Sequence, residues 1–226
     1  MLLFCDDHIA VADKPSGMLV HRGWDNDRVV LMTAVRDALG SWVYPVHRID
    51  RGASGAVVFA RSPEIARVLG GAFERGEVDK RYLALVRGIP GEHVVIDHPI
   101  PRKPGGPRVP SVTEVRRLET FGRYALVEAR PRTGRLHQIR RHLKHISCPL
   151  IGDVRYGKGP HNRLFRERYD LHRLALHAAS IAFAHPATRA PVQFEAPLPD
   201  DLRRALDRLR DAAVSSPHPV TGKTVN

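Results

Sequence analysis

The chain has little cysteine and no long apolar segment. Its 226 residues include two cysteines, Cys5 and Cys148. Two thiols are too few for a disulfide framework or a four-ligand zinc site, so we expect both to be reduced and Cys148 to be a small core residue. No apolar run approaches the roughly 18 residues that span a bilayer, and Asp6-Asp7 interrupts the short apolar N-terminus, unlike in a signal peptide. We therefore expect a cytoplasmic protein without membrane contact.

Acidic residues are also scarce relative to basic ones. The chain has 24 Asp and Glu against 36 Lys and Arg, which gives a formal net charge of +12. Such an excess favours a polyanionic partner, and composition alone leaves RNA, DNA and an anionic membrane open. Hydrophobic residues make up 42% of the chain, which is enough for a sizeable core and argues against disorder.

The histidines do not form a recognisable metal motif. A count of 13 suggests a histidine-based metallohydrolase as one rival function, with His137, His142 and His145 as ligands. Spacings of five and three residues place these side chains poorly on one helix face, and the chain contains no H-E-x-x-H motif. The sequence therefore disfavours this function.

Hydrophobic periodicity predicts an α+β fold. One helical pattern covers residues 31–39, a second lies between Ser62-Pro63 and Gly76, and a third covers residues 202–209. Strand patterns cover residues 9–12, 18–21, 56–60, 82–86, 112–118, 124–129 and 181–184. Because strands outnumber helices and no internal repeat or heptad occurs, we expect a largely antiparallel mixed sheet flanked by helices and loops.

One segment lacks such a pattern and is strongly basic. Residues 100–110 are rich in Pro and Gly and carry Arg102, Lys103 and Arg108. We expect a mobile basic loop between strands, and its three cations are candidate phosphate contacts.

Two separated segments place an acid among bases. Residues 47–55 read H-R-I-D-R-G-A-S-G, and residues 133–142 read T-G-R-L-H-Q-I-R-R-H. Neighbouring guanidinium groups favour the ionised form of Asp50, as a nucleophile or a base requires. Local sequence also allows a plainer interpretation, in which Asp50 is a turn or capping residue and Arg140 lies on the solvated basic face of a helix.

Both segments resemble the signature motifs of the RluA-like pseudouridine synthases, H-R-L-D-x-x-T-S-G and T-G-R-x-H-Q-I-R. Further segments resemble other motifs of that family and occur in the family's order. They read D-K-P-S-G at residues 13–17, K-R-Y-L-A-L-V at 80–86, P-L-I-G-D-V-R-Y-G at 149–157, and L-A-L-H-A with a later H-P within 174–186. The resemblance covers almost the whole chain and favours the functional interpretation of Asp50.

The resemblance implies isomerisation of a uridine in RNA to pseudouridine, with no cofactor and no metal. Asp50 corresponds to the catalytic carboxylate, which either attacks the ribose covalently or removes a proton from it. Arg140 corresponds to the salt-bridge partner of this acid, and a bidentate fork would orient the carboxylate and keep it ionised. Tyr82 corresponds to the tyrosine that stacks on or hydrogen-bonds to the detached base, although such a residue is usually part of a core.

The resemblance also implies the pseudouridine synthase catalytic domain without the S4 RNA-binding domain of many relatives. We expect one such domain over residues 1–214, followed by a flexible polar tail over residues 215–226. RNA binding must then rely on the basic surface of this domain. Ala53 and Asp13 replace the usual Thr and Asn of the motifs, which affects loop geometry and leaves the catalytic acid in place.

Basic residues near the motifs are candidate RNA contacts. Arg48 lies two residues before Asp50, so both side chains share a face of an extended segment; it corresponds to a residue that enters the space of the extruded nucleotide, with phosphate binding as its alternative role. Lys14 either binds phosphate or is solvated. We expect His47 and His137 to support loops and not to transfer protons. Further candidates are Arg135, Arg141, Lys144 and Arg155, together with Arg102, Lys103 and Arg108.

One branch of the family fits best, the branch that modifies uridine 65 at the base of the tRNA T-arm. The similar segments are residues 19–24, the segment that leads to residues 35–37, residues 140–145, and Asn162-Arg163. Relatives that act on rRNA or on the tRNA anticodon stem share the catalytic motifs and stay as alternatives. A basic RNA-binding or ribosome-assembly protein is the rival without enzyme activity, and no obligate protein partner is indicated.

Overall fold

The computed structural model describes residues 2–22, 29–102 and 105–215 of the chain. Its strands are β1 (Leu2–Cys5), β2 (Ile9–Lys14), β3 (Tyr44–Pro45), β4 (Ser54–Ala60), β5 (Asp79–Arg87), β6 (His93–Asp97), β7 (Ile100–Pro101), β8 (Arg108–Val109), β9 (Val112–Phe121), β10 (Tyr124–Pro131), β11 (Leu176–Ala184) and β12 (Pro191–Glu195). Its helices are α1 (Leu31–Leu39), α2 (Pro63–Arg75), α3 (Gln138–His145), α4 (Gly159–Tyr169) and α5 (Asp200–Ser215).

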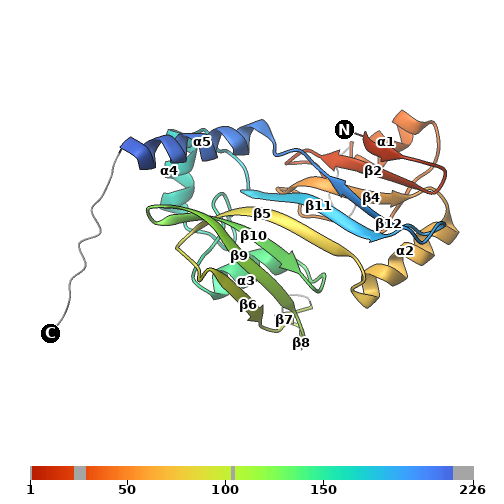
Figure 1. Cartoon of the computed structure of the whole chain (residues 1–226), viewed down its shortest axis with the longest axis horizontal. Coiled ribbons are helices and arrows are strands. Elements are labelled where there is room, and N and C mark those ends of the chain that lie inside the picture. The colour runs from red at the N-terminus through yellow and green to blue at the C-terminus, as the bar shows by residue number, and fades with distance from the viewer. Residues whose placement is uncertain (1, 23–28, 103–104, 216–226) are drawn as a thin grey trace.

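One ten-stranded sheet connects the two ends of the molecule (Figure 1). The strand order is β1-β2-β4-β11-β5-β10-β9-β6, with β12 added to β11 and β3 added to β4. All pairs are antiparallel except β4 and β11, which run parallel over a short stretch. The α+β class with a largely antiparallel sheet is confirmed.

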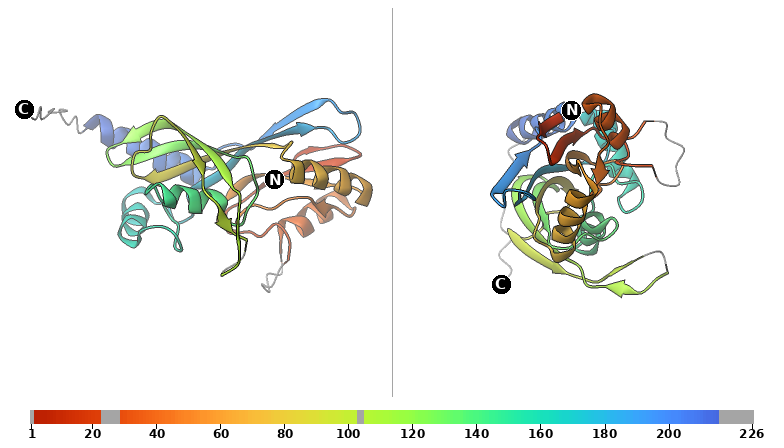
Figure 2. Two further views of the ribbon diagram at one scale, coloured as in Figure 1. Left: turned by 90° about the horizontal axis from the view of Figure 1, so that it is seen from below. Right: turned by 90° about the vertical axis from the view of Figure 1, so that its right-hand side faces the viewer.

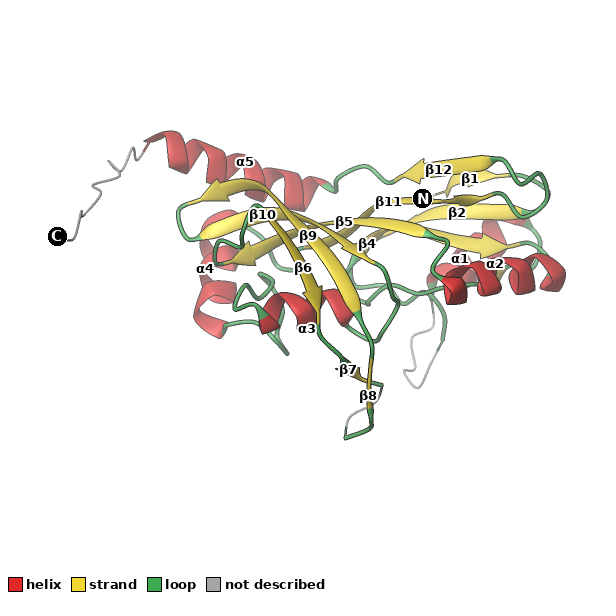
Figure 3. Ribbon diagram, turned by 60° about the horizontal axis from the view of Figure 1, so that its bottom comes forward, coloured by secondary structure: helices red, strands yellow, loops and turns green. Residues whose placement is uncertain are grey.

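Successive side chains of a strand point to opposite faces of the sheet, so apolar side chains occur on both faces and helices pack against each. In β4, Val57 and Phe59 pack in a core cluster that includes residues of α1 and α3, whereas Ala56 and Val58 pack in a second cluster with α2. A third cluster joins Leu85 of β5 to α4 and α5. Figures 2 and 3 show α5 along one side of the sheet, with α3 and the β7–β8 hairpin on the other.

The three predicted helices are confirmed, with ends that their sequences explain. The backbone N–H of Ile65 donates to Ser62 Oγ at the start of α2. Gly40 and Gly76 end α1 and α2 with φ values of 61° and 74°, a left-handed conformation that costs glycine little. The six other predicted strands lie within β2, β4, β5, β9, β10 and β11.

The strand predicted over residues 18–21 is wrong. The carbonyl oxygens of Leu19 and Val20 accept hydrogen bonds from the backbone N–H groups of Leu31 and Met32 at the start of α1. These groups therefore satisfy the first turn of a helix and are not available for a strand ladder. The β-branched Val20 in this segment was therefore not sufficient to predict pairing with another strand.

The basic segment over residues 100–110 is more ordered than predicted. β7 and β8 pair with each other as a short antiparallel ladder, in which Ile100 faces Val109 and Pro101 faces Arg108. This hairpin projects away from the large sheet (Figure 3). Lys103 lies outside the described residues. The flexible tail was predicted over residues 215–226; Ser215 is the last residue of α5, and residues 216–226 lie outside the described residues.

Candidate active site

A cleft of about 550 Å³ brings the two acid–base segments together. Its walls come from the loop before β4, the C-terminal part of α2, the start of β5 and the segment from β10 into α3. The lining residues include Arg48, Asp50, Lys80, Tyr82, Arg135, His137 and Ile139. The volume is in the range of pockets that enclose small organic molecules.

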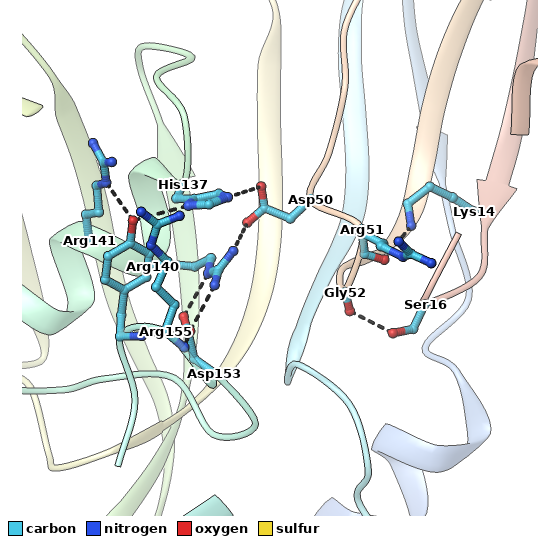
Figure 4. A network of polar contacts seen from close by, with 11 residues as sticks. Lys14, Ser16, Asp50, Arg51, Gly52, His137, Arg140, Arg141, Asp153 and Arg155 are labelled. Atoms are coloured by element: carbon cyan, nitrogen blue, oxygen red, sulfur yellow. Dashed lines mark hydrogen bonds and ion pairs between the residues drawn. The ribbon is translucent and has the colours of Figure 1, made fainter. Parts of the chain in front are cut away.

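Asp50 lies at the centre of this cleft with 19% of its side chain exposed. Arg140 Nη1 donates to Asp50 Oδ2 over 3.2 Å, and His137 Nε2 lies 3.9 Å from Oδ1 (Figure 4). The backbone carbonyl of Asp50 also accepts from Ala53 N at 3.0 Å, which closes a turn. Asp50 is therefore a turn residue and an acid paired with a cation at the same time.

Arg140 does not form the expected bidentate fork with Asp50. Its fork holds Asp153 instead, with Nε at 2.7 Å from Oδ2 and Nη2 at 2.9 Å from Oδ1. The side chain of Asp153 is completely buried, and its Oδ1 also accepts from the backbone N–H groups of Arg155 and Tyr156. Burial alone would raise the pKa of Asp153, but these donors and the Arg140 charge hold it below its ordinary value.

Asp153 is a site residue that the sequence reasoning missed. It lies in the P-L-I-G-D-V-R-Y-G segment, which contributed to the family resemblance, but Asp153 itself was given no role. Gly152 has φ 76°, and a Cβ atom there would overlap with the carbonyl oxygen of Arg173. Asn162 of α4 fixes the same turn, because its side chain accepts from Gly152 N and donates to the Asp153 carbonyl at 2.9 Å each.

Tyr82 lies on β5 and lines the cleft. Burial and the charge of Asp50 raise the pKa of its hydroxyl, so Tyr82 stays protonated. Its ring packs against the core cluster of α1 and α3. None of the described residues forms a hydrogen bond with its hydroxyl, which leaves that group available to a ligand in the cleft.

His47 supports the loop that carries Asp50. Its Nε2 accepts from the backbone N–H of Val58 at 2.9 Å, and its ring stacks on Phe73 at a centroid distance of 4.6 Å. Burial, with a smaller effect of Lys80, lowers the pKa of His47 to about 3. His47 is therefore neutral and already used as an acceptor.

The assignment of Lys14 to RNA binding is wrong. Lys14 is fully buried, and its Nζ donates to the carbonyl oxygens of Pro15, Met18 and Arg51 at 2.9, 2.6 and 3.1 Å. An ammonium group has three donors, so none is left for a phosphate. Lys14 instead ties the turn after β2 to the loop of Asp50, as Figure 4 shows.

The other candidate cations are distributed between the cleft and its surroundings. Arg48 and Arg135 are exposed and line the cleft. Arg102 and Arg108 are exposed on the β7–β8 hairpin, while Arg141 and Lys144 belong to α3. None of Arg48, Arg135 and Lys144 forms an ion pair with a carboxylate of the described residues. Arg48 and Arg135 thus place positive charge along the cleft without a carboxylate partner among the described residues.

The three histidines of the metallohydrolase hypothesis do not converge. His142 is buried and uses both ring nitrogens, on Thr113 Oγ1 and on the His98 carbonyl. His145 stacks on the ring of His98, whereas His137 lies beside Asp50. Among the described residues no group of three or more potential ligands could hold a metal ion. No described helix is long and apolar enough to cross a membrane.

Comparison with known proteins agrees with this geometry. Residues 8–145 match the sequence profile of the family described as RNA pseudouridylate synthase. Two curated relatives, both named tRNA pseudouridine synthase C, are each 38% identical to the chain. The relative from Vibrio cholerae serotype O1 aligns over 87% of the chain and 90% of its own length, and that from Salmonella typhimurium over 91% and 88%.

Solved structures show the same fold. Human RNA Pseudouridylate Synthase Domain Containing 4 has a TM-score of 0.76 at 26% identity, with 92% of both chains covered. Human RNA Pseudouridylate Synthase Domain Containing 1 has a TM-score of 0.73 at 25% identity, with 96% of both chains covered. The family predicted from the motifs is thus confirmed, and the chain belongs to the RNA pseudouridylate synthase family.

Proposed function

We propose that this chain is a tRNA pseudouridine synthase whose catalytic carboxylate is Asp50. The observation that carries the proposal is the position of Asp50, half-buried in the cleft and held by Arg140. A protein that only binds RNA gains nothing from a carboxylate directed at a polyanion, whereas an enzyme of this family needs one. The names of the curated relatives support tRNA as the substrate.

In the reaction, the bond between uracil N1 and ribose C1′ breaks and a bond between C5 and C1′ forms. Asp50 starts this exchange either by attack on C1′ or by removal of a ribose proton. The C5 proton leaves and N1 gains one, so no cofactor is consumed. Arg140 orients Asp50 through one N–H group, and Tyr82 holds the detached base by stacking or by its hydroxyl.

The RNA approaches through the exposed cations. A uridine within a stem must leave the helix before it reaches Asp50, which costs a few kcal/mol of lost stacking and pairing. Arg48 lines the cleft and either fills the vacated space or binds a phosphate. Arg135, Arg141, Lys144, Arg102 and Arg108 supply further phosphate contacts.

Uridine 65 of the T-arm stem is the proposed target, and the cytoplasm, where tRNA is modified, is the proposed location. The test is incubation of an unmodified tRNA transcript with purified enzyme, followed by carbodiimide-based or mass-spectrometric mapping. We expect conversion at position 65 alone and no product when cytidine occupies that position. Conversion at another uridine would overturn the target and leave the reaction intact.

Asp50→Asn tests the catalytic role. The amide keeps the shape of the side chain but loses its charge, so it can neither attack nor accept a proton. We expect no detectable pseudouridine and a Kd for tRNA within a few-fold of wild type. Turnover above about a tenth of wild type, or roughly 1.4 kcal/mol of barrier, would contradict the assignment.

A further inference from the structure

Tyr156, in the turn after Asp153, is surrounded by cations. The charged groups of Arg140, Arg155, Arg141 and Lys144 lie 5.1, 5.6, 5.8 and 5.9 Å from the centre of its ring. Each distance is within the range of a cation–π contact. Four positive charges, which repel one another, therefore lie within 6 Å of the centre of one aromatic ring.

Three of these charges have no carboxylate partner among the described residues. Arg140 is neutralised by Asp153 and Asp50. Arg141 donates only to the Tyr156 hydroxyl and to the Pro101 carbonyl, both at 3.0 Å, and Lys144 and Arg155 are exposed. Like charges held around one ring repel each other, and a bound anion removes that cost.

The hydroxyl of Tyr156 connects this group of cations to His137, which lies beside Asp50. Arg141 Nε is 3.0 Å and His137 Nδ1 is 3.2 Å from the Tyr156 oxygen. Arg141 can only donate, so the oxygen accepts from it and the hydroxyl hydrogen is free to donate to His137 Nδ1. In that case the neutral imidazole carries its own hydrogen on Nε2.

The opposite tautomer is unfavourable for an electrostatic reason. With the hydrogen on Nδ1, the lone pair of His137 Nε2 would face Asp50 Oδ1 at 3.9 Å, and two electron-rich atoms would repel. With the hydrogen on Nε2, the N–H dipole points toward the carboxylate. Burial also lowers the pKa of His137, against the effect of Asp50, which favours a neutral ring.

We propose that Tyr156 is a positioning residue that joins a binding site for one RNA backbone phosphate, formed by Arg141, Lys144 and Arg155, to the catalytic carboxylate. Its ring holds the three cations together, and its hydroxyl holds His137 with Nε2–H toward Asp50. The proposal rests on the proposed role of Asp50 in one respect, because the orientation of His137 matters for turnover only if Asp50 reacts.

Tyr156→Phe separates the orientation of His137 from phosphate binding, because it removes the hydroxyl and keeps the ring. We expect kcat to fall about tenfold, the size of one lost hydrogen bond, with the Kd for tRNA and its salt dependence unchanged. Tyr124→Phe is the matched control, since the Tyr124 hydroxyl bonds to His161 Nδ1 at 2.9 Å outside the cleft. That variant should keep wild-type kcat and report any general effect on folding.

A double-mutant cycle shows whether Tyr156 acts through His137. In a His137→Gln background, Tyr156→Phe should lower kcat less than about twofold. Imidazole ¹⁵N NMR at about pH 8, with His137 assigned by its absence in His137→Gln, should show the Nε2–H tautomer in wild type and a mixture in Tyr156→Phe. This readout does not depend on activity, so it stays valid even if Asp50→Asn were to retain turnover.

Lys144→Gln combined with Arg155→Gln tests the phosphate site. We expect weaker tRNA binding and a slope of log Kd against log salt that is smaller by about 1 to 2. Tyr156→Leu, which removes the ring, should also weaken binding, whereas Tyr156→Phe should not. The proposal is overturned by an Nδ1–H tautomer in wild type, by an unchanged kcat in Tyr156→Phe, or by an unchanged salt slope in the double variant.

Discussion

At the scale of single residues, Arg140 is shared unequally between two carboxylates. Its rigid fork holds the buried Asp153, and one remaining N–H group holds Asp50. A fork on Asp50 would engage both of its oxygens. The observed division fixes the guanidinium on a buried anchor and leaves Asp50 Oδ1 without a hydrogen bond from Arg140.

Asp153→Asn should therefore lower both stability and activity. The change leaves Arg140 partly buried with one carboxylate, and we expect a loss of about 3 kcal/mol of unfolding free energy near pH 7. The folded pKa of Asp153 lies below the ordinary 3.8, so its contribution is complete above that pH and is lost as the pH falls through the folded value. Urea titrations across this range should show the difference from wild type shrinking below about pH 4.

The control for this prediction is Asp200→Asn, which breaks an exposed ion pair with Arg203. It should change stability little at any pH, because exposed pairs contribute little. Equal destabilisation by both variants would show that the buried Arg140–Asp153 pair contributes no more to the free energy of unfolding than an exposed ion pair.

Lys14 gives a pH dependence of the same sign as Asp153, but in a higher pH range. Burial lowers its pKa from 10.5 to about 7, so the unfolded chain binds this proton more tightly than the folded one. The charged form is penalised in the folded state below about pH 7, and the penalty disappears as the pH rises toward 10.5. The stability of wild type relative to Lys14→Met should rise over this range, by at most about 1.4 kcal/mol per pH unit. A stability difference between wild type and Lys14→Met that stays constant over this pH range would contradict the lowered pKa of Lys14.

At the scale of elements, the β7–β8 hairpin is attached to α3 by polar contacts. Arg141 Nη1 donates to the Pro101 carbonyl, and His142 Nε2 bonds to the His98 carbonyl just before β7. The hairpin extends beyond the large sheet on the side of α3 (Figure 2). We expect Arg102 and Arg108 of this hairpin to contact RNA that is docked over the cleft.

Arg102→Gln combined with Arg108→Gln should weaken tRNA binding and reduce the slope of log Kd against log salt by about 1 to 2. Kd values measured over a series of salt concentrations provide the check. Arg116→Gln combined with Arg189→Gln removes the same charge elsewhere. Arg116 alternates along β9 with Val115, which packs in the core cluster of α3, so it points to the other face of the sheet. If both pairs reduce the slope equally, the hairpin has no specific contact.

At the scale of the whole molecule, the sheet brings together segments that are far apart in sequence. β4 carries the Asp50 loop at its start, β5 carries Tyr82, and β10 leads into the segment with His137 and Arg140. The order β4-β11-β5-β10 places these strands in one row, so the cleft lies across the middle of the sheet. The chain as a whole carries a formal net charge of +12, which favours association with a polyanion such as RNA.

A binding surface of this kind recognises backbone shape more than base sequence. We therefore expect a full-length tRNA transcript with uridine 65 to react with a kcat/KM at least about tenfold above that of an isolated anticodon stem-loop or an rRNA hairpin. Single-turnover and steady-state assays with the three RNAs provide the comparison. A higher kcat/KM for either of the other RNAs would reject the proposed target while leaving family and reaction in place.

Much of the fold followed from local patterns in the sequence. The spacing of apolar residues and the capping residues predicted α1, α2 and α5, because those signals act within one or two turns of a helix. The longer strands were predicted for the same reason. The two motifs around Asp50 and Arg140, through their resemblance to a family, predicted the pair that the structure brings to 3.2 Å.

Only the tertiary structure decided which partners the polar groups found. The segment at residues 18–21 resembles a strand, yet its carbonyls satisfy α1; Lys14 resembles a phosphate ligand, yet three carbonyls surround it. Strands β1, β3, β6 and β12 were not predicted, because segments of two to five residues are too short for a clear periodic pattern. Helix α4 was not predicted either. The fork of Arg140 holds Asp153 for a related reason: a completely buried carboxylate needs a charged partner more than a partly exposed one, and burial is a property of the folded chain.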